Sequence, residues 1–254
     1  DASDPDKRLA QLVNAVKRVY ASTFAPRARA FLDATLYRLE EEAMAVVIQK
    51  VVGARHGDRF YPDISGVARS HNFYPTPPAE PEDGLAAVAL GLGKTVAEGE
   101  PCLRFAPTHP NHILDHSTLN DILEHSQREF WAIQMGEDPP AGGWASDGPL
   151  RRHGLRVAQD DGTLQAVGSS YSAENQIVYD GLSRGKVKLV SFAPILKHGI
   201  FPLADILEEL LTLGRAGTRL PVEIEFAAVL PKGKGEPAEF GFLQLRPLAR
   251  WREG

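Results

Sequence analysis

Two segments near the C-terminal end alternate polar and apolar residues with a period of two. The first reads VEIEF at 222–226, and the second reads FGFLQLRP at 240–247. This alternation is typical of half-buried strands, in which residues i and i+2 share one face. Glu223 and Glu225 therefore point to one side of the first strand, and Gln244 and Arg246 share a side of the second. If the two strands pair as a hairpin, all four side chains lie on one surface.

Helical spacing of apolar residues predicts three helices elsewhere in the chain. Asp4 and Pro5 fit the N-cap and first position of a helix whose apolar face runs to Tyr20. A second helix is expected to begin after Pro26 and run to about residue 36. A third is predicted over 202–213, with Gly214 as the residue that follows its C-terminal end.

Short apolar or alternating runs predict the remaining strands, at 44–52, 63–73, 84–90, 103–105, 126–135 and 187–195. The run MAVVIQKVV at 44–52 favours a buried strand because it is apolar and rich in β-branched residues. We also expect a hairpin over 155–167, turning at 160–162, and a polar segment at 169–180 that leads into a short helix. Together these elements predict an α+β fold with an antiparallel or mixed sheet and flanking helices.

The C-terminal hairpin carries the most suggestive chemistry. Paired carboxylates such as Glu223 and Glu225 supply the hard oxygen ligands that Mg²⁺ takes, usually together with substrate phosphates. Arg246 is suited to bidentate contacts with phosphate. The four side chains therefore fit a site for a metal-bound polyphosphate. The alternative is an amphipathic pair of strands with a wet outer face, and spacing alone leaves both interpretations open.

Composition narrows the class of protein. The net charge of −5 over 254 residues argues against nucleic acid as a general partner. The single cysteine, Cys102, excludes an internal disulfide and fits a reducing compartment, so we expect a cytoplasmic protein. There is no apolar run of about 20 residues to span a membrane, and no signal peptide is recognisable. Because the chain starts at Asp1, we expect it to be a piece of a longer polypeptide.

Other motifs are weaker. The segment at 91–95 (GLGKT) ends like a P-loop, but the full pattern requires glycine where the chain has Val88. His109, His112 and His116 have a spacing that could hold zinc on a helix, yet Pro110 interrupts it, so loop histidines are the favoured interpretation. The segment at 136–148 is rich in glycine and proline and predicts a linker, a domain boundary or an insertion.

Five segments in this order resemble one known family. They are VYAS (19–22), MAVVIQKVV (44–52), SGVARSHNFYP (65–75), DGLAAVALGLGKTVAEG (83–99) and VEIEFA…GFLQLRPL (222–248). Together they are similar to the N-terminal ATP-binding region of phosphoenolpyruvate synthases and pyruvate, phosphate dikinases, which is an ATP-grasp fold. The resemblance runs from about residue 9 to residue 248, and the E-x-E…Q-x-R-P pair is its most specific part.

The resemblance implies roles for matching residues. Glu223, Glu225 and Gln244 would hold Mg²⁺ and the polyphosphate of ATP, with Arg246 contacting the phosphates, so that Arg246 and Glu225 act in catalysis. Gln49, Lys50, Val51 and Val52 would form the strand whose backbone lines the adenine pocket, and Gln49, Lys50, Val51, Val52, Gln244 and Arg246 together would bind the nucleotide. Many relatives carry an acidic residue where this chain has Lys94, which leaves the contact made there open.

The resemblance also implies partners. The family has an earlier subdomain with a phosphate-binding lysine and an R-S-S segment, a mobile phosphohistidine domain with a T-x-H motif, and a pyruvate-binding barrel. None of these is recognisable in the sequence. We therefore expect residues 1–254 to form mostly the second ATP-grasp subdomain, which alone would bind nucleotide weakly and turn over nothing. Three alternatives remain: a related phosphotransferase with another acceptor, a non-catalytic nucleotide-binding module, and a zinc protein.

Overall fold

The computed structural model describes residues 4–33, 43–113, 118–136, 148–184, 187–231, 233 and 235–248. By its internal contacts the chain divides into two units, Asp1–Val51 and Val52–Gly254. The first unit contains α1 (Pro5–Ser22) and α2 (Pro26–Asp33). The predicted helix start is confirmed, because the Asp4 carboxylate accepts from the backbone N–H groups of Asp6 and Lys7 at 3.0 and 3.3 Å.

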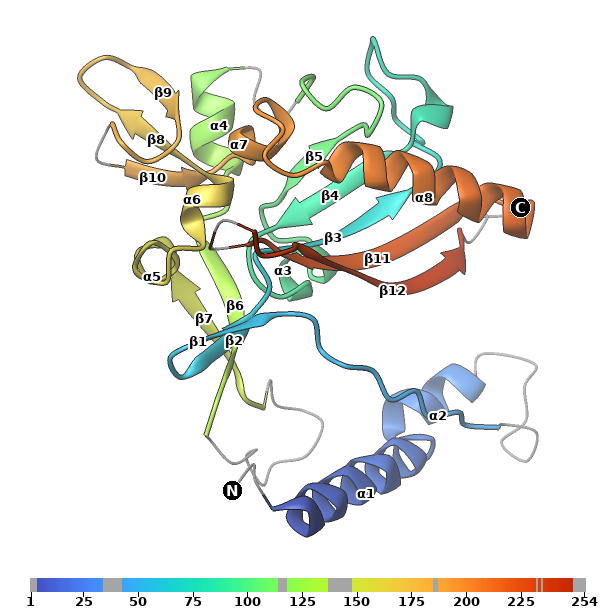
Figure 1. The fold of residues 1–254 in the computed structure, drawn as a ribbon. Helices are drawn as coiled ribbons and strands as arrows, with labels where there is room; N and C mark the ends of the chain where they lie inside the picture. Colours follow the sequence, from blue (N-terminus) through green and yellow to red (C-terminus); the bar gives the residue numbers. More distant parts are fainter. Residues whose placement is uncertain are drawn as a thin grey trace. The chain divides into compact units, whose positions relative to one another are not determined.

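The second unit is built on three antiparallel sheets (Figure 1). The largest has the order β12-β11-β3-β4-β5, with bounds β3 (Ile64–Arg69), β4 (Leu85–Ala89), β5 (Leu103–Phe105), β11 (Val222–Val229) and β12 (Glu239–Pro247). A four-stranded sheet contains β1 (Ala54–His56), β2 (Arg59–Tyr61), β6 (Glu129–Gln134) and β7 (Leu150–Gly154). A three-stranded sheet contains β10 (Val187–Val190), β8 (Gly168–Ser172) and β9 (Ile177–Asp180).

The helices of this unit are short, apart from one. Their bounds are η2 (Pro81–Asp83), α3 (Lys94–Ala97), α4 (Leu119–His125), α5 (Leu155–Asp160), α6 (Leu164–Val167), α7 (Ala193–Leu196) and α8 (Leu203–Thr218). The α+β class predicted from the sequence is confirmed. All the pairings between these strands are antiparallel.

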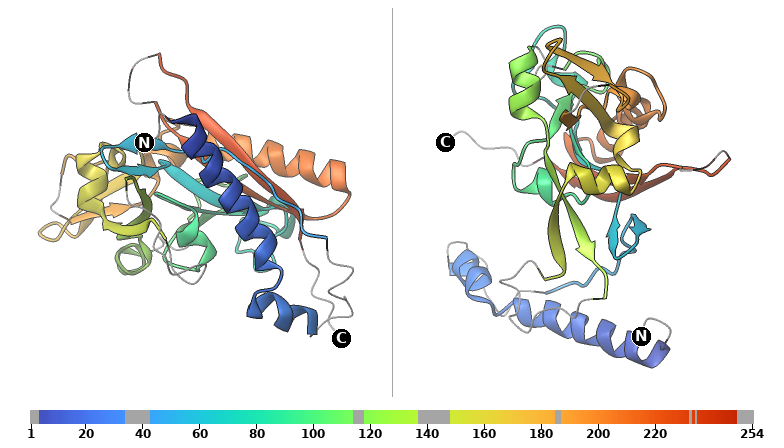
Figure 2. Two further views of the ribbon diagram at one scale, coloured as in Figure 1. Left: turned by 90° about the horizontal axis from the view of Figure 1, so that it is seen from below. Right: turned by 90° about the vertical axis from the view of Figure 1, so that its left-hand side faces the viewer.

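Helix α8 fixes the apolar face of the five-stranded sheet. It packs on β11 and β3 and runs beside the strands in Figure 1 and in the left-hand view of Figure 2. The buried leucines of α8 recur every four residues, at Leu203, Leu207 and Leu211. They pack in one core with the even-numbered residues of β11, Val222, Ile224 and Phe226. Each of these six residues is at most 3% exposed. Because side chains alternate along a strand, the odd-numbered residues of β11 project from the opposite face.

Gly66 and Gly214 show how tightly this layer is packed. A Cβ on Gly66 would lie 2.5 Å from the Ala87 carbonyl oxygen, so only glycine allows β3 and β4 to approach this closely. Gly214 was expected to end its helix, and that prediction is wrong. Helix α8 continues to Thr218 and ends at Arg219 in the left-handed conformation. Gly214 instead lets the helix approach the hairpin, since its Cβ would lie 2.9 Å from Val222 Cγ2.

Three further element predictions are wrong. Residues 43–53 contain no strand, and Val47 and Ile48 are 81% and 65% exposed, because an apolar run forms a buried strand only where partner strands pair with it. The predicted hairpin at 155–167 is α5 and α6, whose buried residues are spaced by three and override the turn signal. The polar segment at 169–180 forms the β8–β9 hairpin, and the next element described after it is the strand β10 instead of the expected short helix.

Candidate functional site

The register of the C-terminal hairpin brings the four predicted side chains together. Strands β11 and β12 pair so that Glu223 lies opposite Arg246, and Glu225 lies opposite Gln244. Directly opposed residues in an antiparallel pair share a face. The prediction that both acids, the carboxamide and the guanidinium occupy one surface is therefore confirmed, and this surface is the face away from α8.

Strand β3 adds a residue that sequence reasoning missed. Arg69 lies directly opposite Glu223 on the other side of β11, and Val67 lies opposite Glu225. The row Arg246–Glu223–Arg69 thus crosses three neighbouring strands on one face. Arg69 is the last residue of its strand, and the sequence carries no signal for which strands become neighbours across 154 residues.

Glu223 is held between the two arginines. Its side chain is only 5% exposed. Its Oε2 accepts from Arg69 Nε at 2.6 Å, and its Oε1 accepts from Arg246 Nε at 2.7 Å and also from Arg246 Nη2. Burial works to raise the pKa of Glu223, but the hydrogen bonds from Arg69 and Arg246 and their charges outweigh it and hold that pKa below its ordinary value. The carboxylate is therefore ionised and fully engaged.

The two arginines keep their outer edges in solvent. The Arg69 and Arg246 side chains are 49% and 56% exposed. The hydrogen bond to Glu223, followed by the charges of Glu223 and Glu225, raises the pKa of Arg246 above its ordinary value. The buried carboxylate and the two guanidinia together carry a net charge of +1, and the Glu225 carboxylate on the same face offsets it, so the surface offers guanidinium donors to an anion beside a carboxylate for a cation.

Glu225 and Gln244 have a different environment. Glu225 is half-buried and Gln244 is exposed. Neither side chain hydrogen-bonds to any residue in the part of the chain that the structure describes. Immediately after this pair the register shifts, and β12 advances two residues, from Gln244 to Phe242, while β11 advances one. Such bulges re-aim side chains and are frequent beside functional sites.

The next row on the same face contains Gly241, Ala227 and Ser65. Two other segments of the chain lie against the two ends of this row. Val52 packs on this row, because a Cβ on Gly241 would lie 2.4 Å from Val52 Cγ2. At the Ser65 end lies Gly93 of the glycine segment, whose Cβ would be 3.9 Å from the Ser65 Cβ. The glycine segment and the end of the 44–52 segment thus border the row of Glu225 and Gln244.

A model of the family "Pyruvate phosphate dikinase, AMP/ATP-binding domain" matches residues 7–254. The chain belongs to this family. None of the curated proteins matches it. The match covers essentially the whole chain and confirms the resemblance recognised from the five sequence segments. It also implies an ATP-grasp-like fold for this dikinase-family domain and ATP as its ligand.

Within the dikinase-family domain, only one residue of the segment expected to line the adenine pocket belongs to the same unit as the hairpin. Gln49, Lys50 and Val51 belong to the first unit. The buried strand predicted over them is wrong, as shown above, and Val51 is 50% exposed. Val52 belongs to the second unit and is the member of this group that contacts β12. The roles of all four in nucleotide binding remain predictions.

Lys94 begins α3 and is turned toward its own helix. Its ammonium lies 2.9 Å from Glu98 Oε1 and 4.6 Å from the centre of the Trp131 ring. Gly91, which precedes it, has φ +84 and packs where a Cβ would lie 2.7 Å from the Trp131 carbonyl oxygen. The glycine is therefore required by its backbone conformation and by this contact.

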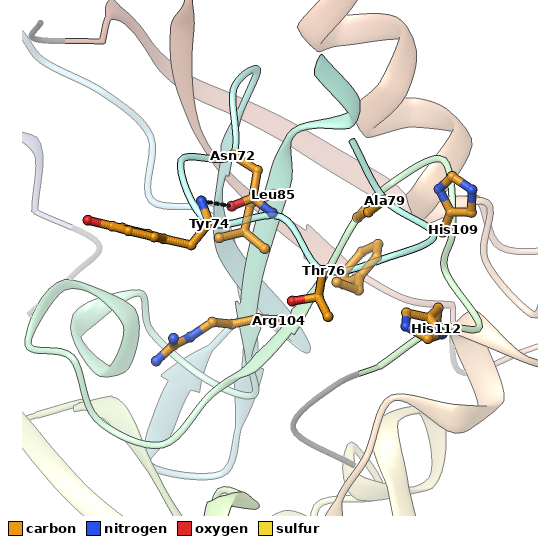
Figure 3. A pocket seen from close by; sticks show the side chains of 10 residues that line it. Asn72, Tyr74, Thr76, Ala79, Leu85, Arg104, His109 and His112 are labelled. Atoms are coloured by element: carbon orange, nitrogen blue, oxygen red, sulfur yellow. Dashed lines mark hydrogen bonds between the residues drawn. The ribbon is translucent and has the colours of Figure 1, made fainter. Parts of the chain in front are cut away.

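The histidines lie elsewhere. His109 and His112 line one side of a cavity of about 200 Å³, and Tyr74 and Arg104 lie at its other side (Figure 3). His109 Nδ1 is 2.9 Å from Thr108 Oγ1 and 3.6 Å from Asp83 Oδ2. His116 lies outside the described residues. Among those that are described, no three His, Cys, Asp or Glu side chains form a metal-binding group, so the zinc alternative gains no support.

The donor set of the hairpin fits Mg²⁺ shared with a nucleotide. Mg²⁺ is typically bound by one or two carboxylates together with substrate phosphates rather than by a complete protein cage. Glu225 and Gln244 offer adjacent oxygens that are not engaged by described residues. Both oxygens of Glu223 are occupied by guanidinia. Among the helices that the structure describes, none has the length and apolar character needed to cross a membrane.

Proposed function

We propose that this domain supplies the Mg-ATP site of a phosphotransferase of the phosphoenolpyruvate synthase and pyruvate, phosphate dikinase type. In this proposal a phosphoryl group passes from ATP to a histidine of a mobile domain, and then to pyruvate. The observation that carries it is the row geometry of the hairpin: Glu225 beside Gln244, flanked by a guanidinium on Arg246 that Glu223 holds in place. The family match supports the nucleotide.

Each side chain has a distinct task in this proposal. Glu225 and Gln244 would hold Mg²⁺, which when bound would neutralise charge on the phosphate oxygens. Arg246 contacts the phosphates and stabilises negative charge as the P–O bond to the leaving group breaks and the bond to the histidine nitrogen forms. Glu223, predicted as a metal ligand, is better suited to orienting guanidinia because arginines occupy both of its oxygens.

The rest of the cleft comes from other parts of the polypeptide. We propose that residues 1–254 are mostly the second ATP-grasp subdomain, and that its partners are an upstream subdomain, a phosphohistidine domain and a pyruvate-binding domain of the same polypeptide. ATP-grasp sites lie between two subdomains, so this chain by itself would bind nucleotide weakly and transfer no phosphoryl group. Val52 and Gly93, which border the Glu225 row, mark where the nucleotide would lie.

Labelling of the full-length protein with radioactive ATP and Mg²⁺ tests this function. We expect an acid-labile, base-stable label, typical of phosphohistidine, that pyruvate discharges. Glu225→Gln should abolish the label without changing the unfolding temperature, whereas Glu208→Gln on the exposed side of α8 should have no effect. A label that pyruvate cannot discharge would indicate another acceptor. ATP binding without any label would indicate a non-catalytic module.

A further inference from the structure

Arg69 forms the third member of the row that crosses the proposed nucleotide site. It sits on β3, directly opposite Glu223, while Arg246 sits opposite Glu223 on β12. Adjacent strands are about 4.8 Å apart, so the two arginine Cα atoms are roughly 10 Å apart on one face. Both guanidinia reach inward to the same carboxylate, one to each oxygen. The two guanidinia therefore flank Glu223 on one face of the sheet.

Neutralising Glu223 does not require two arginines. Arg246 alone makes two hydrogen bonds to Oε1 and balances the carboxylate charge. Arg69 uses only its Nε on Glu223, and its two Nη groups contact no hydrogen-bond acceptor among the described residues. Because Arg69 is 49% exposed, these donors face solvent on the same surface as Glu225. The second guanidinium gives the row Arg246–Glu223–Arg69 one excess positive charge, beside a Glu225 carboxylate that Mg²⁺ would engage in the proposed site.

We propose that Arg69 is a second phosphate-binding guanidinium of this site, which contacts the terminal phosphoryl groups of the nucleotide together with Arg246. The inference rests on the proposed function, because it places those phosphates over the hairpin. Two guanidinia fixed by one buried carboxylate form a preorganised clamp for a polyphosphate, since little side-chain entropy remains to be lost on binding. The neighbouring residue on this face, Val67, is uncharged and adds no repulsion toward a phosphate.

Calorimetry on the full-length protein with Mg²⁺ and the β,γ-imido analogue of ATP, and separately with AMP, tests the clamp. Arg69→Gln keeps a neutral donor near Glu223 but removes the fork and its charge. We expect it to weaken binding of the triphosphate analogue at least about tenfold and binding of AMP less than about twofold. Arg69→Lys, which restores charge but not the fork, should fall between the two. Arg156→Gln on α5 controls for the change in net charge, because Arg156 is exposed and remote in sequence from the row.

The outcomes separate the clamp from a purely structural role. If Arg69 only stabilises Glu223, Arg69→Gln will weaken both nucleotides equally or will lower the unfolding temperature without selective loss of the triphosphate. Either result, or unchanged binding of the triphosphate, would overturn the inference while leaving the proposed function intact. A wild-type protein that binds neither nucleotide would overturn both. If Arg69→Gln fails to fold, Arg69→Lys still decides the question through its selectivity between triphosphate and AMP.

Discussion

Glu223 and Arg69 stand directly opposite each other on neighbouring strands, and Arg69 Nε donates to Glu223 Oε2 across 2.6 Å. Glu223 is the only one of the two that is buried, at 4% exposure. The buried Glu223 carboxylate therefore needs its arginine partners to compensate for lost hydration, whereas the Arg69 guanidinium still reaches solvent and can contact a ligand. The relationship makes Glu223 the anchor of the site and its replacement the most informative test of stability.

Glu223→Gln should destabilise the protein. The carboxamide leaves one guanidinium facing an N–H₂ group instead of an anionic oxygen, and the three hydrogen bonds from Arg69 and Arg246 lose the assistance of the carboxylate charge. Because both arginines are about half exposed, water recovers part of the loss, and we expect about 2 kcal/mol in the free energy of unfolding. Urea unfolding measures it, with Glu208→Gln as the exposed control. If Glu223→Gln lowers the free energy of unfolding no more than Glu208→Gln does, the ion pairs of Glu223 with Arg69 and Arg246 contribute nothing to stability.

The same pair predicts a pH dependence. The folded-state pKa of Glu223 lies below its ordinary value of about 4.5, so its stabilising contribution is fully present above that value. The contribution is lost as the pH falls through the lower, folded-state pKa. The difference in unfolding free energy between wild type and Glu223→Gln should therefore be constant from pH 7 to about 5.5 and shrink below about 4.5. A difference that grows on acidification would contradict the depressed pKa.

Local patterns predicted the hairpin because its information is local. The alternation of polar and apolar residues places Glu223 and Glu225 on one face of their strand. Because β11 and β12 are consecutive in the sequence, their pairing as a hairpin can be predicted without knowing which distant strands become neighbours. Arg69 was missed because its position depends on which strand lies beside β11, a choice made by the whole sheet. The strand predicted at 44–52 failed for a related reason, since no ladder partner is provided for it among the described residues.

Competing signals account for the errors between residues 155 and 180. The turn at Gly162 was read correctly and has φ +79, but it joins two short helices rather than two strands. Leu155 with Ala158, and Leu164 with Val167, are buried pairs at helical spacing. In 169–180 the polar composition concealed a hairpin whose turn carries Gln176 at φ +51. Burial patterns decide such segments, and composition alone does not.

Gly214 gives a packing prediction with an internal control. Alanine ordinarily favours a helix over glycine by about 1 kcal/mol. At 214, however, the added Cβ would lie 2.9 Å from Val222 Cγ2 and 3.0 Å from Leu245 Cδ1, and Val222 is a stiff, buried side chain. Gly214→Ala should therefore destabilise by about 1–2 kcal/mol. Gly217→Ala, where the Cβ would meet nothing within 4 Å, should stabilise by about 0.5–1 kcal/mol. Equal effects of the two substitutions on the free energy of unfolding would show that α8 does not pack against Val222 and Leu245 at position 214.

The division of labour between Glu225 and Gln244 can be tested through Mg²⁺. If both side chains supply oxygens to the metal, Gln244→Ala should raise the Mg²⁺ concentration needed for half-maximal ATP binding by at least about tenfold, the effect typical of losing one supporting group. Gln244→Glu, which restores an oxygen and adds charge, should lower that concentration below the alanine variant's. Because Gln244 is exposed and makes no hydrogen bond to a described residue, neither variant should change the unfolding temperature. The opposite result would be a wild-type Mg²⁺ dependence in Gln244→Ala while Glu225→Gln still loses its ATP-dependent label. That result would leave Glu225 as the metal ligand on this hairpin and remove Gln244 from the site.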